Sequence, residues 1–187
     1  FKLFVDRPGL CVSSLLNRLV KLDIMLQEKA EGKWIASFRR VLKLNGIGEG
    51  TSVAIVAESQ SRPILRELSE IALYDLGATF FTVDLPTPEQ TALVPVKSTG
   101  ASNAIAGMRP VIEALKKVEV IVDVTVEGLL HAEEWPEIEE AGTRLFVICN
   151  EHPEILERTE PRAELGPKVN RGIEMLRDAS EMRVTSG

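Results

Sequence analysis

Short apolar runs alternate with amphipathic segments along most of the chain, and no other feature restricts its fold as strongly. The apolar runs have the length and the β-branched or aromatic content of strands, and they lie at 52–57, 79–85, 118–126 and 144–149. The segments with helical spacing of apolar residues lie at 34–44, 63–76, 104–117, 132–141 and 165–179. Apolar strands that alternate with helices are typical of a parallel sheet with helices on both faces. Because parallel crossovers are right-handed, we expect an open, mostly parallel, Rossmann-like α/β sheet.

The two ends of the chain add less regular elements. Residues 9–30 show helical spacing of their apolar side chains, which are Val12, Leu15, Leu16, Leu19, Leu22 and Met25. We therefore expect an amphipathic helical extension over residues 1–34 and an α/β domain over residues 35–187. Residues 182–185 are a candidate for a short fifth strand. Gly77, at the end of the segment 63–76, stands where a helix end favours a left-handed residue.

The composition excludes several classes of protein. The net charge of −6 speaks against broad binding to nucleic-acid phosphates. No apolar run approaches the roughly 20 residues of a membrane-spanning helix. Asp6, Arg7 and Arg18 interrupt the stretch where a secretory signal would be apolar. Cys11 and Cys149 form neither a metal-binding spacing nor a disulfide framework, so we expect a cytoplasmic protein that binds neither nucleic acid nor membranes.

The strongest candidate for a functional residue is His131. It follows the run at 118–126, so we expect it on a loop at the edge of the sheet where open α/β proteins bind ligands. Leu129 and Leu130 precede it, and apolar side chains on an exposed loop are costly unless a partner or ligand covers them. An imidazole beside apolar groups suits a general base. The alternative is that His131 caps a helix starting at Ala132 and that both leucines pack in the core.

Three other parts of the sequence are weaker candidates for a functional role. GIGEGTS, residues 46–52, precedes a strand and lacks the lysine of a phosphate-binding loop, so we interpret it as a turn. ESQSRP, residues 58–63, follows the first strand and is a second place at the same edge where a ligand can bind. Cys149 ends an apolar strand and is expected to be buried. His152 lies three residues further on, a spacing that need not bring the two side chains together.

The residues themselves predict no metal site. The chain has only two histidines, His131 and His152. Its carboxylates gather in two segments, 133–140 and 151–160, that look like solvated helix faces. Without histidines grouped beside them, neither segment forms an iron or zinc site.

From Phe38 onward the chain resembles a known enzyme family. The stretches that carry the resemblance occur in matching order and are FRRVLKLNGIGEGTSVAIVAE (38–58), FFTVDLP (80–86), STGASNAI (98–105), VIVDVTVEGLLH (120–131), AGTRLFVICNEHPEILER (141–158) and MRVTSG (182–187). They look like the N-terminal domain of the 2,5-dihydroxypyridine 5,6-dioxygenases, ring-opening enzymes related in fold to the aminopeptidase T (M29) metallopeptidases. The most specific piece is Leu-Leu-His at 129–131. Residues 1–34 show no such resemblance.

The resemblance implies a division of labour between two domains. Dioxygenases of this family hold one non-haem Fe(II) through two His and one Asp of a second, C-terminal domain, which this chain lacks. The chain alone is therefore expected neither to bind iron nor to turn over substrate. The family also carries a His on a loop that closes over the substrate and handles its protons, beside a Leu that packs on the ring. By this resemblance, His131 is the acid/base residue and Leu130 the apolar cover for a small aromatic substrate. We also expect a homo-oligomer.

Two other functions stay open. The first is the equivalent domain of an M29-like metallo-aminopeptidase. The second is a non-catalytic α/β module for binding or assembly, in which the amphipathic segment 9–30 would dock on a partner chain. The activity of the full-length protein separates the two enzymes, because one consumes O2 with iron and the other releases leucine from peptides with cobalt or zinc.

Overall fold

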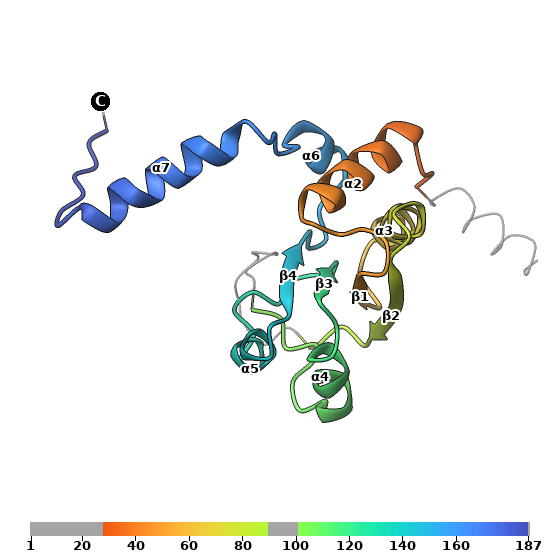
Figure 1. Cartoon of the computed structure of the whole chain (residues 1–187). Coiled ribbons are helices and arrows are strands. Elements are labelled where there is room, and N and C mark those ends of the chain that lie inside the picture. The colour runs from red at the N-terminus through yellow and green to blue at the C-terminus, as the bar shows by residue number, and fades with distance from the viewer. Residues whose placement is uncertain (1–27, 90–100, 187) are drawn as a thin grey trace, which may run out of the picture.

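The structure is a computed structural model that describes residues 28–89 and 101–186. Its centre is a four-stranded sheet whose strands run parallel in the order β2-β1-β3-β4 (Figure 1). The strands are β1 (Ser52–Glu58), β2 (Thr79–Leu85), β3 (Val120–Asp123) and β4 (Arg144–Val147). The helices are α2 (Gly32–Leu44), α3 (Pro63–Asp75), α4 (Arg109–Leu115), α5 (Trp135–Glu140), α6 (Pro153–Arg158) and α7 (Leu165–Asp178). The predicted parallel α/β sheet is confirmed.

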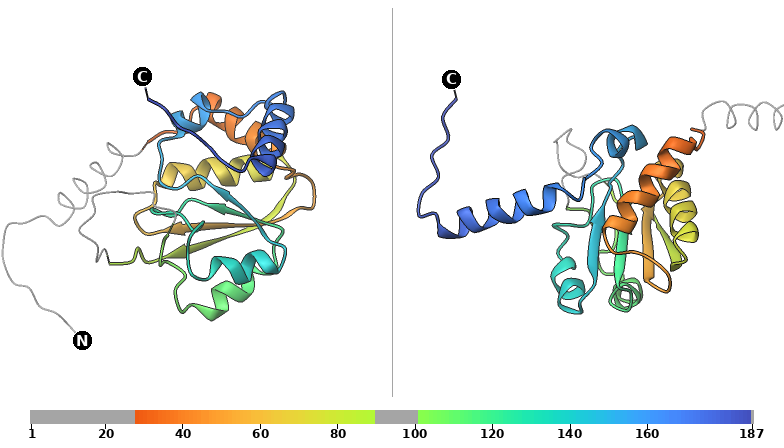
Figure 2. Two further views of the ribbon diagram at one scale, coloured as in Figure 1. Left: turned by 90° about the vertical axis from the view of Figure 1, so that its left-hand side faces the viewer. Right: turned by 45° about the horizontal axis from the view of Figure 1, so that its top comes forward.

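Helices cover both faces of the sheet, as predicted. α2, α3 and α6 lie on one face, and α4 and α5 lie on the other (Figures 1 and 2). Strand β1 runs between two apolar cores, and its side chains alternate between them. Val53 and Ile55 pack in the core under α2 and α3, whereas Ala54 and Val56 pack in the core under α4 and α5. A strand buried on both faces needs apolar residues at every position, which explains the continuous apolar run in the sequence.

Several predicted elements are shorter than the sequence indicated. The helix expected at 104–117 is confined to α4, and residues 104–107 form turns instead. The strand expected at 118–126 ends at Asp123, because the Asp123 side chain accepts hydrogen bonds from the backbone that follows and replaces the strand ladder there. Helix α6 lies within the segment 151–160, whose carboxylates looked like a solvated helix face, but no apolar spacing marked a helix there. It has only six residues, too few for helical spacing to show, and it begins where Pro153 occupies the first turn.

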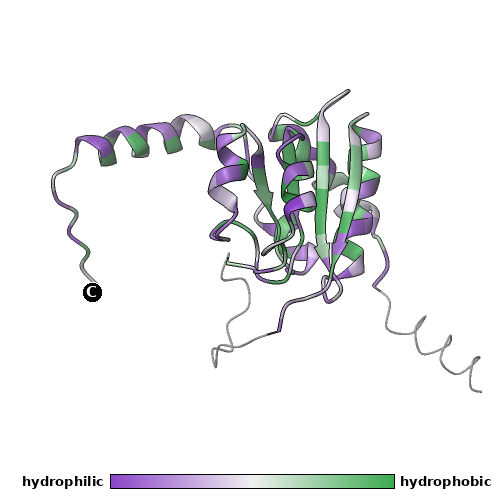
Figure 3. Ribbon diagram, turned by 90° about the horizontal axis from the view of Figure 1, so that it is seen from below, coloured by the Kyte–Doolittle hydropathy of each residue, from purple (hydrophilic) through white to green (hydrophobic). Residues whose placement is uncertain are grey.

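The predicted strand at 182–185 is wrong. Residues 179–186 form no strand and are exposed, since α7 extends away from the sheet and leaves β4 at its edge (Figure 1). No residue of α7 is buried, and apolar and polar positions alternate along it (Figure 3). The predicted helix at 9–30 lies almost wholly outside the described residues. Within the described ranges, no helix is both long enough and apolar enough to span a membrane.

Candidate functional site

Strands β1 and β3 end side by side at the carboxyl edge of the sheet. The strand order β2-β1-β3-β4 reverses between β1 and β3, and open α/β sheets bind ligands outside the carboxyl ends of their strands at such a reversal. Glu58 is the last residue of β1, and Asp123 is the last residue of β3. Both acidic residues are buried, with 3% and 0% of their surface exposed. Buried carboxylates need hydrogen-bond donors around them, and the next loops supply these.

The Asp123 carboxylate organises the loop that follows β3. Its Oδ1 accepts hydrogen bonds from the backbone N–H of Thr125 (2.9 Å) and from the Thr125 hydroxyl (2.6 Å). Its Oδ2 accepts a hydrogen bond from the backbone N–H of Leu129 (2.6 Å). The Thr125 hydroxyl oxygen also accepts from the N–H of Gly128 (3.0 Å). The chain from residue 124 to residue 129 is thereby folded around one carboxylate.

The surroundings of Asp123 act on its ionisation in two directions. Burial raises the pKa of the Asp123 carboxyl above its ordinary value, because the charged form loses its hydration, and the nearby charge of Glu58 adds to the rise. The hydrogen bonds from Thr125 and Leu129 act to lower the pKa, since they stabilise the carboxylate. The net direction is upward, so burial outweighs the hydrogen bonds.

The two residues singled out in the sequence emerge from this loop. Leu129 is 1% exposed and packs in the core, whereas Leu130 is 47% exposed. His131 is also exposed and lies on a turn, before α5 starts at Trp135. The N-cap of α5 is Glu134 and makes no side-chain cap hydrogen bond, so His131 does not have the capping role that was the alternative interpretation. Of the two leucines, one packs inside and one faces out.

A second loop supports the first from the side of β1. The Ser102 hydroxyl donates to Oε1 of Glu58 (2.8 Å), and the Ser102 backbone N–H donates to the carbonyl oxygen of Gly128 (2.7 Å). The Ser102 hydroxyl oxygen in turn accepts from the N–H of Ala104 (3.1 Å). Oε2 of Glu58 is buried and has no hydrogen-bond partner among the residues that the structure describes. The ends of β1 and β3 are thus linked through Ser102.

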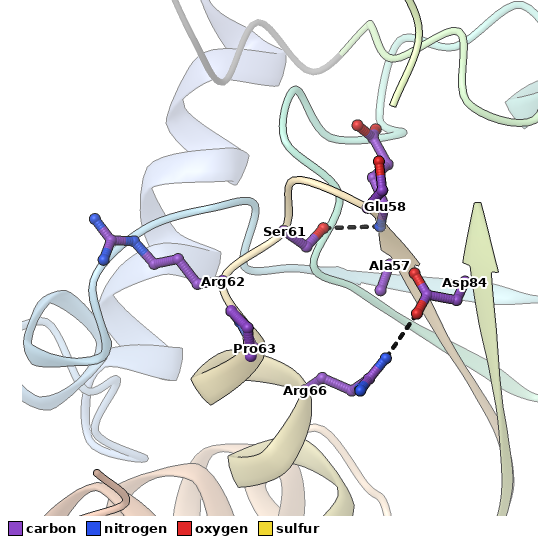
Figure 4. Close-up of a pocket in the computed structure, with 8 residues that line it drawn as sticks. Ala57, Glu58, Ser61, Arg62, Pro63, Arg66 and Asp84 are labelled. Carbon is purple, nitrogen blue, oxygen red and sulfur yellow. Dashed lines mark hydrogen bonds and ion pairs between the residues drawn. The ribbon is translucent and has the colours of Figure 1, made fainter. Parts of the chain in front are cut away.

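A cavity of about 180 Å³ lies beside this edge, between the end of β1 and the start of α3 (Figure 4). The segment 58–63, which the sequence indicated as a place for a ligand, contributes most of its lining. Two pairs of polar groups in the lining bind each other. Nη1 of Arg66 lies 2.7 Å from Oδ2 of Asp84, and the Ser61 hydroxyl oxygen accepts from the Glu58 N–H (2.8 Å). The Arg62 side chain points away from Glu58 and Asp84 (Figure 4), and its Nη1 donates to Oε1 of Glu28 (2.6 Å).

Cys149 and His152 have separate structural surroundings. Cys149 is 6% exposed, in agreement with the prediction that it is buried. Nδ1 of His152 accepts the backbone N–H of Glu154 (3.2 Å) at the start of α6. The His152 ring meets the Trp34 ring edge-on, with the ring centres 5.3 Å apart. His152 therefore serves as a helix cap and a packing residue.

Known proteins resemble this chain in both sequence and fold. Residues 33–187 match the family model described as NicX, 2,5-dihydroxypyridine 5,6-dioxygenase. The chain belongs to this dioxygenase family. The 2,5-dihydroxypyridine 5,6-dioxygenase of Pseudomonas putida KT2440 is 28% identical to it over 151 residues, or 80% of this chain. A solved structure of the 2,5-dihydroxypyridine dioxygenase from that organism has a TM-score of 0.72, with 28% identity, and covers 81% of this chain.

The family resemblance and the fold class predicted from the sequence are both confirmed. The chain spans only 42% of the length of the curated dioxygenase and 44% of the solved one. A structure of Klebsiella oxytoca NpsA in complex with 3-hydroxyanthranilyl-AMSN is 16% identical and has a TM-score of 0.40. This match covers 72% of the present chain and 20% of the NpsA chain.

The described residues do not fit a metal cofactor of the kind that a dioxygenase implies. No group of three or more His, Cys, Asp or Glu side chains within residues 28–89 and 101–186 is placed to hold a metal ion. His131 is exposed on its turn, while the two buried acids Glu58 and Asp123 already accept hydrogen bonds from Ser102, Thr125 and Leu129. What these residues form is a hydrogen-bonded support for a loop.

Sequence reasoning missed the residues that build this support. Asp123 and Thr125 fall within the strand predicted at 118–126. A signal was present in Asp-Val-Thr at 123–125, because Asp and Thr side chains commonly bind nearby backbone N–H groups where a strand ends. The link from Ser102 to Glu58 joins residues 44 positions apart and has no local signal.

Proposed function

We propose that this chain is the N-terminal domain of a non-haem Fe(II)-dependent ring-cleaving dioxygenase that acts on a dihydroxypyridine-type substrate. In this proposal His131 is the acid/base residue and Leu130 covers the substrate ring. The observation that carries the proposal is the exposed Leu130–His131 pair at the carboxyl edge of the sheet, in a member of this family, on a loop tied to a buried carboxylate. Iron ligands would come from the part of the parent protein that this chain does not include.

The chemistry assigned to His131 requires a group that changes its charge near neutral pH. Imidazole suits this role, because one ring nitrogen can accept a proton while the other donates one. A hydroxyl group on a pyridine ring is a weak acid, and an exposed imidazole at the sheet edge can accept its proton. Leu130 offers an apolar surface next to His131. Contact between Leu130 and the ring would reduce the access of water to the reacting atoms.

The test of this proposal is substitution of His131 in the full-length parent protein. His131→Ala is expected to lower kcat for 2,5-dihydroxypyridine on the order of 10²- to 10⁴-fold, the usual contribution of a general acid or base. His131→Gln keeps a polar side chain of similar size but cannot take up a proton, so it should show a similar loss. The control is Glu133→Gln, which changes an exposed residue two positions away.

Two results would contradict the proposal. One is an unchanged kcat with an unchanged pH profile in both His131 variants, which would remove His131 from the mechanism. The other is release of leucine from peptides by the parent protein without O2 uptake, which would support a metallopeptidase instead. The chain of 187 residues by itself is expected to show no turnover, and O2 uptake by the purified chain would show that it needs no further domain.

A further inference from the structure

The loop that presents His131 is held from inside by two side chains that water does not reach. Asp123 and Thr125 are each 0% exposed. We infer that Asp123 and Thr125 are positioning residues, which fix the place of His131 at the edge of the sheet through hydrogen bonds to the backbone of the loop. The inference rests on the proposed function of His131. It adds two residues that neither the family resemblance nor the sequence pattern assigned.

The hydrogen bonds connect the start of the loop to its end. Thr125 donates its hydroxyl to Asp123 and accepts the N–H of Gly128 on the same oxygen. The other carboxylate oxygen of Asp123 accepts a hydrogen bond from the N–H of Leu129. These donors are buried and would lose free energy if left without acceptors. Hydrogen bonds to a carboxylate are also shorter and stronger than those between neutral groups. The path of the backbone from Asp123 to Leu129 is thereby fixed.

The position of His131 follows from the position of Leu129. Leu129 is anchored twice, by its N–H to Asp123 and by its side chain in the core. The carbonyl oxygen of Leu129 then accepts the N–H of Ala132, which closes the turn that contains His131 (3.1 Å). A shift of Leu129 would therefore move the imidazole. A misplacement of about 1 Å at a reacting group can cost on the order of 100-fold in rate.

A matched set of threonine variants in the full-length parent protein tests the inference. Thr125→Val keeps nearly the same shape but removes both hydroxyl bonds, whereas Thr125→Ser keeps the hydroxyl. The control is Thr143→Val. Thr143 is also buried, at 3% exposure, and its hydroxyl donates to the carbonyl oxygens of Leu115 and Val118, away from the His131 loop. Both valine variants remove buried hydroxyl bonds, but only one alters the loop.

We expect Thr125→Val to lower kcat on the order of 10- to 100-fold. For Thr125→Ser and Thr143→Val, kcat should stay within about threefold of that of the parent protein. Thr125→Val should also change the pH profile of kcat, because His131 is displaced from the substrate. Both valine variants should lower Tm to a similar extent. Asp123→Asn is the companion variant: it replaces one carboxylate oxygen with an NH2 group that cannot accept a hydrogen bond, so the backbone N–H of either Thr125 or Leu129 loses its acceptor. It should show the same loss of kcat as Thr125→Val.

The outcomes separate this inference from the proposed function. If His131→Ala lowers kcat but Thr125→Val does not, the positioning role is wrong and the role of His131 stands. If Thr125→Val and Thr143→Val lower kcat equally and both keep the pH profile of the parent protein, the loss comes from general stability. The positioning role is then again wrong. If His131→Ala leaves kcat unchanged, the proposed function fails and the inference fails with it.

Discussion

Two carboxylates of this domain, Asp123 and Glu160, have pKa shifts of opposite sign because their neighbours differ. Asp123 is fully buried, and burial raises the pKa of its carboxyl. Glu160 lies just after α6, where it accepts hydrogen bonds from Nη2 of Arg40 (2.7 Å) and from the Ser37 hydroxyl (3.1 Å). The hydrogen bond from the Arg40 guanidinium lowers the pKa of Glu160. Ionised Glu160 therefore favours the packing of α6 on α2, whereas Asp123 holds its loop against an unfavourable burial of charge.

The Glu160 contact predicts a stability that depends on pH. The folded-state pKa of Glu160 lies below its ordinary value of 4.5, so its contribution is present above that pH and is lost as the pH falls through the lower pKa. Glu160→Gln should therefore lower Tm near neutral pH, and the difference from the unchanged chain should narrow in acid. Thermal unfolding monitored by circular dichroism at several pH values measures this. Glu133→Gln, an exposed control, should not alter Tm, and a Glu160 effect that persists undiminished in acid would contradict the prediction.

At the scale of elements, the turn between α3 and β2 depends on one glycine. Gly77 has a φ of +72°, and a Cβ at this position would lie 3.5 Å from the Glu49 backbone. Gly77→Ala should destabilise the domain by about 1–2 kcal/mol, since a side chain disfavours the left-handed conformation. Gly32→Ala is the control, because a Cβ there meets nothing within 4 Å. Urea unfolding measures both, and equal stability of the two variants would show that the turn can change its conformation without cost.

The elements that sequence reasoning predicted well are those with a repeated local signal. The helix at 63–76 combines apolar spacing, a proline at its first turn and Gly77 at its end, and it matches α3 closely. The strand at 118–126 was predicted too long because its apolar run continues past Asp123, and only the three-dimensional contacts show that the ladder stops there. The strand at 182–185 was wrong, since β-type composition cannot reveal whether a neighbouring strand is within reach.

The candidate site was also predictable only in part, because contacts between distant residues decide which of its side chains are exposed. The prediction placed Leu130 and His131 on a loop at the edge of the sheet, and the structure has both exposed there. The sequence could not distinguish Leu129, which packs in the core, from Leu130, which faces out. That difference depends on the hydrogen bond that turns the Leu129 backbone toward Asp123. The role of His131 in catalysis remains a prediction that the kinetic test decides.

At the scale of the whole molecule, the described residues form a sheet covered on both faces and one helix that the sheet does not contact. α7 has an apolar stripe of Leu165, Val169, Ile173 and Leu176, and all four side chains are exposed by 42–64%. Its charged residues, such as Arg171, lie on the opposite side of the helix. The family match extends through α7 to residue 187. An apolar stripe of this length in a folded protein usually lies against another surface.

We expect the chain to associate with copies of itself through the α7 stripe, as the homo-oligomer expected in the sequence analysis requires. The double substitution Val169→Glu and Ile173→Glu places two charges in the stripe and should shift the mass measured by multi-angle light scattering toward that of one chain. Arg171→Glu is the matched control, because it changes the net charge by the same amount on the opposite face and should leave the mass unchanged. Association that survives the double substitution would place the contact elsewhere. Exposed apolar surface drives association in proportion to the area that contact removes from water. If the unchanged chain is monomeric even at high concentration, the stripe therefore has no role in self-association.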